Sequence, residues 1–561
     1  RPTKGAHIRM PCLSDSCVKI RQETVTGVGI VIPSDRKETR NLYQRMKMKR
    51  TVMIVMLLAA FAANAQQMEE TLQAKVEALA SDAAFSQSVV GICARTAGGE
   101  TLVDINSEVM MLPASNMKLI STGAALHALG PDWQFETSLG YDGTIEDGTL
   151  QGDLYIIGGG DPTLGSKDSI AVVIERTFAQ WEAVIRAAGI RRIDGRIVGD
   201  GRFFEGMAEE PTWLLEDAGT YYGAGTTGLM FYENMQSFSV SAGAEVGDPV
   251  NIKPYYPEAP WMEFRYNCST GKEGTGDMLY MYVSHLVPVA EVRGTFGVDR
   301  AAKRVDCTNK FPEYTCAYYF YNYLKKKGLT CTGGPSDARS GVALSSMSGV
   351  ASEAGRGVAG ALAPAARPDP ASSLTLLGST FSPTLDRIAF ETNHASNNVF
   401  AETLLRILGK EFRGSASYDS CDVALNDVLK ELAVDTSRGL QVQDGSGLSR
   451  QNYVSADFFC RFLDAMMDSP AYGNFLASLP SPGGNGTLNY NMKGQPAALR
   501  ERIKVKSGSM NGVRCYSGYI LPADVNSETI VFSIMTNNCT SPTWKVRPLL
   551  DKIMVTLAST N

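Results

Sequence analysis

The chain has 561 residues, more than a single compact hydrophobic core usually organises, so we expect two or three domains. Hydrophobic residues make up 44% and charged residues 20%, which is the balance of an ordinary globular protein. The formal net charge of −6 argues against a protein that binds nucleic acid through a basic surface.

The first 65 residues have the pattern of an export signal rather than of a folded domain. Residues 46–67, MKMKRTVMIVMLLAAFAANAQQ, begin with basic residues, continue with an apolar run and end with small residues at Ala63 and Ala65. This is the order of a secretory signal peptide, and the apolar run is too short for a comfortable membrane span. Residues 1–45 are interpreted as an upstream extension. We therefore expect an exported, periplasmic, soluble protein without a stable membrane anchor.

Charge and cysteine content change when this segment is set aside. Residues 1–65 hold 12 Lys+Arg and 4 Asp+Glu, so the remaining chain carries a net charge of −14 and nine cysteines. Export permits disulfides, and bridges could form in the middle third among Cys268, Cys307, Cys316 and Cys331. No pair has Cys-x-x-Cys spacing, so the sequence predicts neither a metal site nor another cofactor.

Residues 66–140 are expected to form the first part of a catalytic domain. A helical pattern covers residues 68–82, and strand patterns cover 88–96 and 101–106 with a turn between them at Gly98 and Gly99. Residues 119–130, LISTGAALHALG, predict a helix that ends at Gly130.

The rest of the chain divides into three stretches. Residues 141–335 are rich in Gly, Tyr and short alternating runs, which predicts one or two inserted β-rich domains interrupted by a helix at 169–189. Residues 336–373 are interpreted as a Gly/Ala-rich linker. Residues 374–561 return to helical patterns and end with three strand patterns and a helix. An α/β (α+β) catalytic domain in two parts, 66–140 and 374–561, is therefore predicted to flank the insertion.

One short segment, PASNMKLIS at 113–121, carries a candidate nucleophile. Ser-x-x-Lys spacing alone is weak, because it occurs four times here, at Ser16, Ser34, Ser115 and Ser269. The first two lie in the predicted export segment, and the fourth lies in a stretch that we expect to be a loop. Only Ser115 opens a helical pattern, where residues three apart share a face and Lys118 can reach the hydroxyl. A desolvated lysine near other positive charge loses its proton more easily and can activate a serine.

Two further motifs follow in a fixed order. Ser396-Asn397-Asn398 is a Ser-x-Asn motif, and Lys506-Ser507-Gly508 is a Lys-[Ser/Thr]-Gly motif at the end of a strand pattern. The ordered set is the signature of penicillin-binding proteins and serine β-lactamases. Over nearly the whole chain after the export signal, the sequence resembles the low-molecular-weight class C penicillin-binding proteins. This is the D-Ala-D-Ala carboxypeptidase/endopeptidase group typified by penicillin-binding protein 4, and the long gap before Ser396 is what its inserted domains imply.

Other segments share this resemblance. They are GGGDPTL (158–164), PTWLLEDAGTYYGA (211–224), DGSGLSRQNYVS (444–455) and GGNGTL (483–488). Three positions depart from common family patterns: Ser507 replaces a more usual Thr, Asn397 replaces an Asp of some relatives, and His394 replaces a basic residue. Because Ser507 keeps the hydroxyl, we expect binding of a substrate carboxylate to survive.

The resemblance implies a serine DD-peptidase acting on the stem peptides of peptidoglycan, with β-lactams as covalent inhibitors. It implies the following catalytic roles: Ser115 as nucleophile, Lys118 as base, Ser396 as proton relay, Lys506 as a charge that keeps Lys118 neutral, and Asn398 as a hydrogen-bonding partner of Lys118 or of the substrate. Substrate-binding roles are implied for Ser507, Gly508, Ser509, Asp217, Tyr222 and Arg450, with the N–H groups of Ser115 and Ser509 forming the oxyanion hole.

Several features have simpler interpretations. His127 is interpreted as a core or helix-face residue, and His394 as unrelated to the nucleophile. Ser446 lacks the first glycine of a Gly-x-Ser-x-Gly elbow and is interpreted as structural, whereas Asp444 is expected to support the site. Gly158–Gly160 predict a tight turn rather than a phosphate loop, since no P-loop lysine follows. Two alternative functions stay open: a non-catalytic peptidoglycan-binding protein of the same fold, and a β-lactamase.

Overall fold

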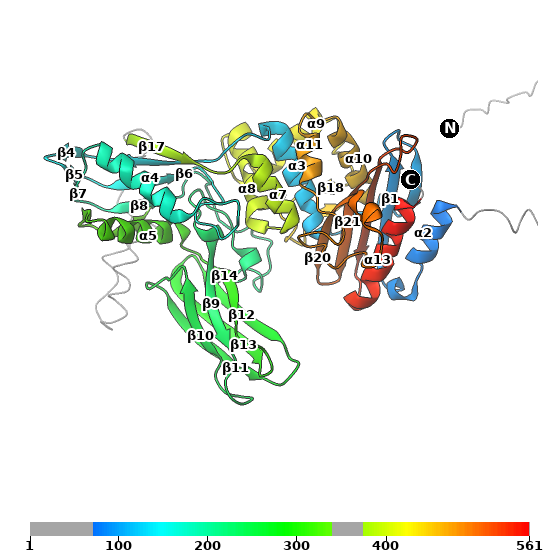
Figure 1. Ribbon diagram of the computed structural model, residues 1–561, viewed down its shortest axis with the longest axis horizontal. Coiled ribbons are helices and arrows are strands. Elements are labelled where there is room, and N and C mark those ends of the chain that lie inside the picture. Colours follow the sequence, from blue (N-terminus) through cyan, green and yellow to red (C-terminus); the bar gives the residue numbers. More distant parts are fainter. Residues whose placement is uncertain (1–70, 339–373, 560–561) are drawn as a thin grey trace, which may run out of the picture. The chain divides into compact units, whose positions relative to one another are not determined.

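The computed structural model describes residues 71–338 and 374–559 (Figure 1). The predicted export signal, the upstream extension and nearly all of the predicted linker lie outside these residues. Within the described ranges, no helix is both long enough and apolar enough to cross a membrane. The nine cysteines in these ranges are free thiols, so the structure contains none of the bridges that the sequence allowed among the middle four.

Strands from the two ends of the chain build one antiparallel sheet, here called the first sheet. In spatial order its strands are β2 (Thr101–Ile105), β1 (Val89–Thr96), β22 (Ile530–Asn537), β21 (Val513–Ile520) and β20 (Ile503–Met510). The central pairing of β1 with β22 runs over eight residues, from Val89 opposite Asn537 to Thr96 opposite Ile530. This pairing joins the two predicted parts of the catalytic fold.

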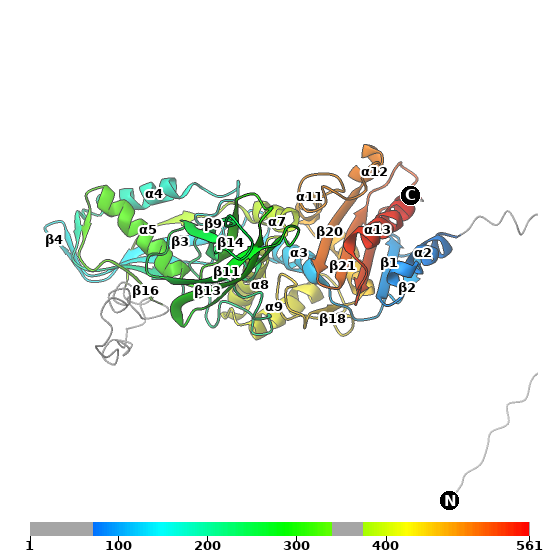
Figure 2. The ribbon, with the colours of Figure 1, turned by 90° about the horizontal axis from the view of Figure 1, so that it is seen from below.

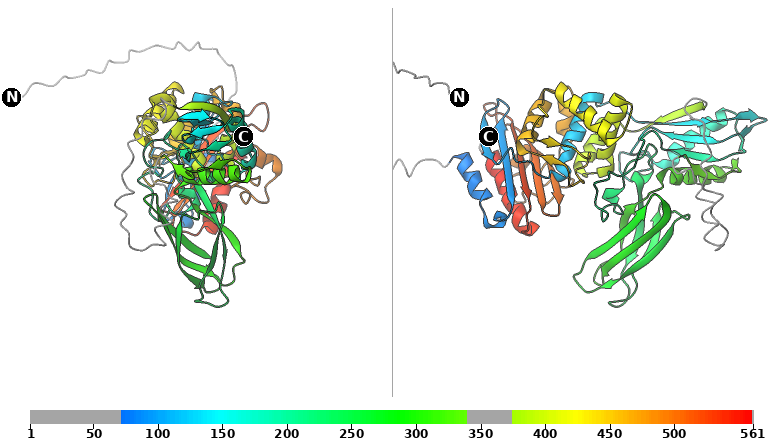
Figure 3. Two further views of the ribbon diagram at one scale, coloured as in Figure 1. Left: turned by 90° about the vertical axis from the view of Figure 1, so that its left-hand side faces the viewer. Right: turned by 180° about the vertical axis from the view of Figure 1, so that it is seen from behind.

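Helices cover both faces of the first sheet (Figure 3). Along β22, Ile530, Phe532 and Ile534 pack against α2 (Leu72–Ala80) and α13 (Thr543–Ala558), while Val531 and Met535 face the opposite core. The alternation follows from the two-residue period of a strand, and burial of both faces explains the unbroken apolar run. The helices of these layers are α2 (Leu72–Ala80), α13 (Thr543–Ala558), α3 (Met117–Leu129), α7 (Leu385–His394), α8 (Asn398–Arg413), α9 (Tyr418–Glu431), α10 (Ala456–Met467), α11 (Tyr472–Ala477) and α12 (Ala497–Glu501).

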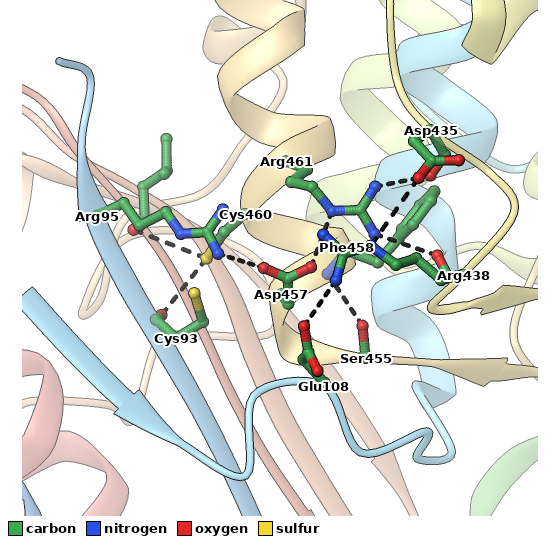
Figure 4. Close-up of polar contacts among 11 residues, drawn as sticks. Cys93, Arg95, Glu108, Asp435, Arg438, Ser455, Asp457, Phe458, Cys460 and Arg461 are labelled. Carbon is green, nitrogen blue, oxygen red and sulfur yellow. Dashed lines mark hydrogen bonds and ion pairs between the residues drawn. The ribbon is translucent and has the colours of Figure 1, made fainter. Parts of the chain in front are cut away.

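A cluster of charged residues joins helix α10 to strand β1 of the first sheet (Figure 4). Asp457 of α10 pairs with Arg95 of β1 and accepts from Arg461 Nε at 2.8 Å. Arg461 also donates to the backbone carbonyls of Asp435 and Arg438. The carboxylate is 5% exposed and lies between two guanidinium groups, so its charge is compensated where α10 meets the strand.

Between β3 and β17 the described chain builds four further sheets. One five-stranded sheet has the order β16 (Pro335–Asp337), β8 (Ile197–Asp200), β6 (Leu154–Gly158), β3 (Glu136–Tyr141) and β17 (Thr375–Phe381). A smaller one has the order β15 (Thr330–Cys331), β7 (Arg192–Ile193), β5 (Thr149–Gln151) and β4 (Thr144–Glu146). Helices α4 (Ile174–Ala187) and α5 (Pro312–Lys326) lie beside these strands and share a core with them (Figure 2).

Two three-stranded sheets complete this region. Their orders are β10 (Asn251–Tyr256), β9 (Met235–Ser241), β14 (Lys303–Thr308), and β11 (Glu263–Gly271), β13 (Val287–Gly297), β12 (Asp277–Ser284). Phe238 and Phe296 are buried in the core that they share. Ser269, in the Ser-x-x-Lys match that we expected in a loop, lies in strand β11.

The boundaries of the insertion differ from the predicted residues 141 and 335. Strand β3 already begins at Glu136, β16 reaches Asp337, and β17 pairs with β3 rather than with the first sheet. Pairing partners of such short strands are distant in sequence, so local patterns do not reveal which sheet a strand joins.

Helix α5 was not predicted, because its sequence PEYTCAYYFYNYLKK is dominated by aromatic residues that favour strands. Its helical pattern appears in Cys316, Phe320 and Leu324, which are spaced by four and fully buried.

Candidate active site

Ser115 lies in a short 3₁₀ turn that leads into α3. The turn, η2 (Ala114–Asn116), follows Pro113, and α3 begins at Met117. Ala114 has a φ of 46°, a left-handed conformation that costs a non-glycine residue about 1–3 kcal/mol and persists only where the surroundings enforce it. The turn places Ser115 at the wall of a cleft of about 840 Å³.

Lys118 lies one turn further along and is fully buried. Its Nζ is 3.1 Å from Ser115 Oγ, and it donates to Asn398 Oδ1 and to the backbone carbonyl of Ser446, each at 2.7 Å. Burial lowers the pKa of Lys118 to about 7, although two carboxylates nearby oppose the shift. An amine with this pKa is substantially neutral near pH 7, so it can accept a proton from a hydroxyl.

The Ser-x-Asn motif lies at a break between two helices. Helical periodicity runs through residues 384–409, but the chain forms α7 and α8 as separate helices with Ser396 at a φ of 58° between them. The Asn397 side chain accepts from Phe400 N and caps α8, so Asn398 becomes its first residue. The break turns Ser396 Oγ toward Lys506 Nζ, at 2.9 Å.

Strand β20 supplies the third motif. Lys506 is fully buried, and its Nζ donates to Ser396 Oγ and to the Ser507 carbonyl at 2.8 Å. Burial and the charge of Lys118 hold the pKa of Lys506 well below its usual value. Ser507, Gly508 and Ser509 line the same cleft as Ser115. Ser507 Oγ lies 3.0 Å from Thr487 Oγ1, so two hydroxyls face the cleft together.

Gly508 is required because strand β20 lies very close to the turn η2 that carries Ser115. A Cβ at this position would lie 2.6 Å from the Pro113 carbonyl oxygen and 3.0 Å from Asn116 N. Gly447, with a φ of 82°, approaches the turn from the other side, where a Cβ would lie 1.8 Å from the Ala114 carbonyl oxygen. Two close backbone contacts therefore enforce the strained turn.

The inserted region contributes one wall of the cleft. Asp217 and Tyr222 of this region line the cleft, as does Arg450 from the later part of the chain. The Asp217 carboxylate is hydrogen-bonded to the Tyr222 side chain. Burial raises the pKa of Asp217 and raises that of Tyr222 to about 12. The Tyr222 carbonyl also accepts from Asn398 Nδ2 at 2.8 Å, so the segment 211–224 touches the Ser-x-Asn motif directly.

All eleven predicted site residues therefore lie at one cleft or directly behind its wall. His127 and His394 make contacts with other side chains: His127 Nδ1 is 2.9 Å from Ser469 Oγ, and the His394 ring stacks on Phe390 with a centroid distance of 3.9 Å. Asp444, which we expected to support the site, accepts from Gly447 N, Ser449 N and Trp213 Nε1.

Two buried carboxylates escaped the sequence analysis. Glu402 accepts from Ser446 N at 2.8 Å, on the loop whose carbonyl contacts Lys118. Glu233 accepts from Asn397 Nδ2 at 2.7 Å and links the inserted region to the cap of α8. The signal for Glu402 was its place one turn after Asn398 on a helical pattern, whereas Glu233 carries no local signal.

The sequence of the chain matches a family of known proteins. The pattern of the D-Ala-D-Ala carboxypeptidase 3 (S13) family matches residues 72–337 and 336–558. The chain belongs to this family. The predicted resemblance to penicillin-binding proteins of the carboxypeptidase group is therefore confirmed, and with it a serine-type carboxypeptidase family for the chain.

Individual relatives span most of the chain. A D-alanyl-D-alanine carboxypeptidase of Actinomadura sp. (strain R39) is 29% identical over 484 residues, which is 84% of this chain and 82% of that protein. The D-alanyl-D-alanine carboxypeptidase DacB of Haemophilus influenzae is 22% identical over 440 residues, or 78% and 83% of the two chains.

A solved structure supports the fold. The crystal structure of penicillin-binding protein 4 from Haemophilus influenzae superposes with a TM-score of 0.70 at 20% identity, covering 86% of this chain and 98% of that one. The predicted α/β fold with inserted β-rich regions is therefore confirmed.

Proposed function

We propose that the protein is a serine DD-peptidase that cleaves D-Ala-D-Ala, or D-Ala-meso-diaminopimelate cross-links, through an acyl-enzyme on Ser115. The observation that carries the proposal is the contact of Ser115 Oγ with the buried amine of Lys118, whose pKa of about 7 suits a general base. Membership of a carboxypeptidase family supports the reaction class.

In acylation, Lys118 takes the hydroxyl proton while Ser115 Oγ attacks the carbonyl carbon of the penultimate D-Ala. The N–H groups of Ser115 and Ser509 stabilise the oxyanion that forms, a contribution of about 3–4 kcal/mol in related chemistry. The peptide bond then breaks, and Ser396 relays the proton held by Lys118 to the leaving amine, which leaves the Lys118 amine neutral again. Water attacks the ester in the second half-reaction and releases the shortened peptide.

The remaining residues bind and orient the substrate. Ser507, with Thr487 beside it, holds the terminal carboxylate, and Asn398 fixes the Lys118 amine. Gly508 lets the substrate strand lie along β20, and Asp217 binds a free amine of the stem peptide with Tyr222 and Arg450 beside it. We further propose that the protein is exported to the periplasm, where peptidoglycan is the substrate, and that β-lactams acylate Ser115.

Labelling with a fluorescent penicillin tests the nucleophile. Wild type is expected to take one covalent label that is stable to denaturation, and Ser115→Ala none. Absence of label on wild type, or equal labelling of Ser115→Ala, would refute the proposal. A labelled enzyme that loses its acyl group within seconds would instead point to a β-lactamase.

Digestion of purified muropeptides tests the substrate. Monomeric pentapeptides report carboxypeptidase activity, and cross-linked dimers report endopeptidase activity. Loss of one D-Ala, or conversion of dimer to monomer, is the expected mass change with wild type. A protein that binds these muropeptides without changing their mass would be a non-catalytic binding protein.

A further inference from the structure

Glu402 lies behind Lys118, and the mechanism above does not use it. It is on α8, one turn after Asn398, and is 1% exposed. Its carboxylate accepts from Ser446 N at 2.8 Å, from Gly445 N at 3.2 Å and from the Tyr418 hydroxyl at 3.3 Å. A buried carboxylate with three donors is compensated, and the two backbone donors belong to consecutive residues of one loop.

That loop holds the catalytic amine. The carbonyl of Ser446 accepts from Lys118 Nζ at 2.7 Å, while the Ser446 side chain makes its own contact with Leu448 N. Asp444 fixes the far side of the loop through Gly447 N at 2.7 Å. Backbone N–H groups on both sides of the Ser446 carbonyl are therefore bound by carboxylates. Asp444 binds Gly447 N, and Glu402 binds Gly445 N and Ser446 N from the α8 side.

We infer that Glu402 is a positioning residue for Lys118: its carboxylate fixes the Ser446 carbonyl, which together with Asn398 aims the amine at Ser115 Oγ. Helix α8 thereby reaches Lys118 twice, directly through Asn398 and indirectly through Glu402. The inference rests on the proposed function, since it assigns the residue a part in the same proton transfer. The expected effect comes from orientation of the Lys118 amine, because a small misplacement of a catalytic group lowers the rate strongly.

Glu402 also acts on Lys118 through its charge. The negative charges of Asp444 and Glu402 raise the pKa of Lys118 against the larger effect of burial. Burial and the neighbouring Asp444 raise the pKa of Glu402 itself. The titratable and charged groups around these two residues are Asp444, Tyr418, Arg406, Glu210 and Lys506.

The variant Glu402→Gln tests whether the Glu402 side chain positions the loop or only fills buried space. Glutamine keeps the volume, but its amide NH₂ must face one of the two backbone N–H donors, so one contact to the loop is lost. Acylation by a fluorescent penicillin is followed across pH, separating the non-covalent binding constant from the maximal acylation rate. We expect the maximal rate to fall by about tenfold or more and the binding constant to stay within about twofold.

Two further variants complete the design. Glu411→Gln, on the exposed face of the same helix, is the matched control and should acylate like wild type. Glu402→Asp keeps the carboxyl group but is too short to hold both N–H groups, so its maximal rate should also fall while its binding constant stays within about twofold. If Glu402→Gln does not fold, as judged by its melting temperature, Glu402→Asp carries the test of position alone.

The outcomes are distinct. A wild-type rate in a folded Glu402→Gln, or in Glu402→Asp where the glutamine variant does not fold, would overturn the inference. A folded Glu402→Gln whose binding constant weakens as much as its maximal rate falls would also overturn it, since that result describes general loosening of the site. Failure of wild type to acylate would instead refute the proposed function.

Discussion

At Lys118 the surroundings change the chemistry of a single residue. A lysine on a helix surface stays protonated, but here the amine is fully buried and meets a hydroxyl, an amide oxygen and a carbonyl. Desolvation favours the neutral form of the Lys118 amine, and its effect on the pKa is larger than the opposing effect of the Asp444 and Glu402 charges. Burial therefore converts an ordinary cation into a base.

The pH dependence of acylation follows from this pKa. Only the neutral amine of Lys118 accepts the Ser115 proton, and its pKa is lowered to about 7. The acylation rate should therefore rise with pH, level off above about 7, and fall by about tenfold per pH unit below it. Rates measured with a fluorescent penicillin in buffers of equal ionic strength check this. A rate that is independent of pH through this range would contradict the assignment.

Removal of the amine is the direct test of its role. Lys118→Ala should abolish acylation and leave the fold intact, as measured by covalent labelling and by circular dichroism. Lys272→Ala is the matched control, because Lys272 belongs to another Ser-x-x-Lys match but is exposed beyond strand β11. Normal labelling of a folded Lys118→Ala would contradict the mechanism.

At the scale of elements, β20 and the turn η2 must lie in backbone contact for the site to exist. Lys506 reaches Ser396 from this strand, and Ser507 faces the cleft from the next position. The spacing depends on Gly508, which has backbone atoms of the turn where a side chain would begin. The glycine of the third motif is therefore a packing requirement as well as a binding feature.

Gly508→Ala should separate the strand from the nucleophile turn. Its Cβ would lie 2.6 Å from the Pro113 carbonyl oxygen, so the backbone must move, and we expect acylation to slow by about tenfold or more. Stopped-flow labelling with a fluorescent penicillin measures the change. Gly473→Ala, where no atom lies within 4 Å of the added Cβ, is the control and should keep the wild-type rate. Equal rates in both variants would show that the contact is unimportant.

At the scale of the whole molecule, the inserted region and helix α8 both line the cleft and also share polar contacts. Arg406 of α8 is 1% exposed and donates to the carbonyls of Glu205, Met207 and Thr226 in the inserted region. It also donates to the Ala416 carbonyl at 3.2 Å. One buried guanidinium thus donates to four carbonyls, three in the inserted region and one at Ala416, just after α8.

Arg406→Met should destabilise the protein by about 3–5 kcal/mol, because it leaves these buried carbonyls without donors. Urea unfolding followed by tryptophan fluorescence measures the free energy. Arg387→Met, on the exposed side of α7, should change it by less than about 0.5 kcal/mol. A similar small change for Arg406→Met would mean that these contacts do not hold the two parts together.

The sequence by itself determined the three motifs, their order and the family they indicate, because each motif is short and its residues are adjacent along the chain. It also determined α3 and the strands of the first sheet, whose apolar periodicity is strong. The break at Ser396 was hidden, since helical periodicity continues on both sides of it and the left-handed φ is a tertiary requirement.

Only the tertiary structure decided how the segments between those motifs fold and which elements they pack against. It joined β17 to β3, folded the aromatic sequence of α5 into a helix, and placed Glu402 and Glu233 behind the site. These outcomes depend on partners that are remote in sequence, and the free energy of such contacts comes from burial that no local pattern records. The same burial lowers the pKa of Lys118, so the motif locates the lysine and the fold lets its amine be neutral near pH 7.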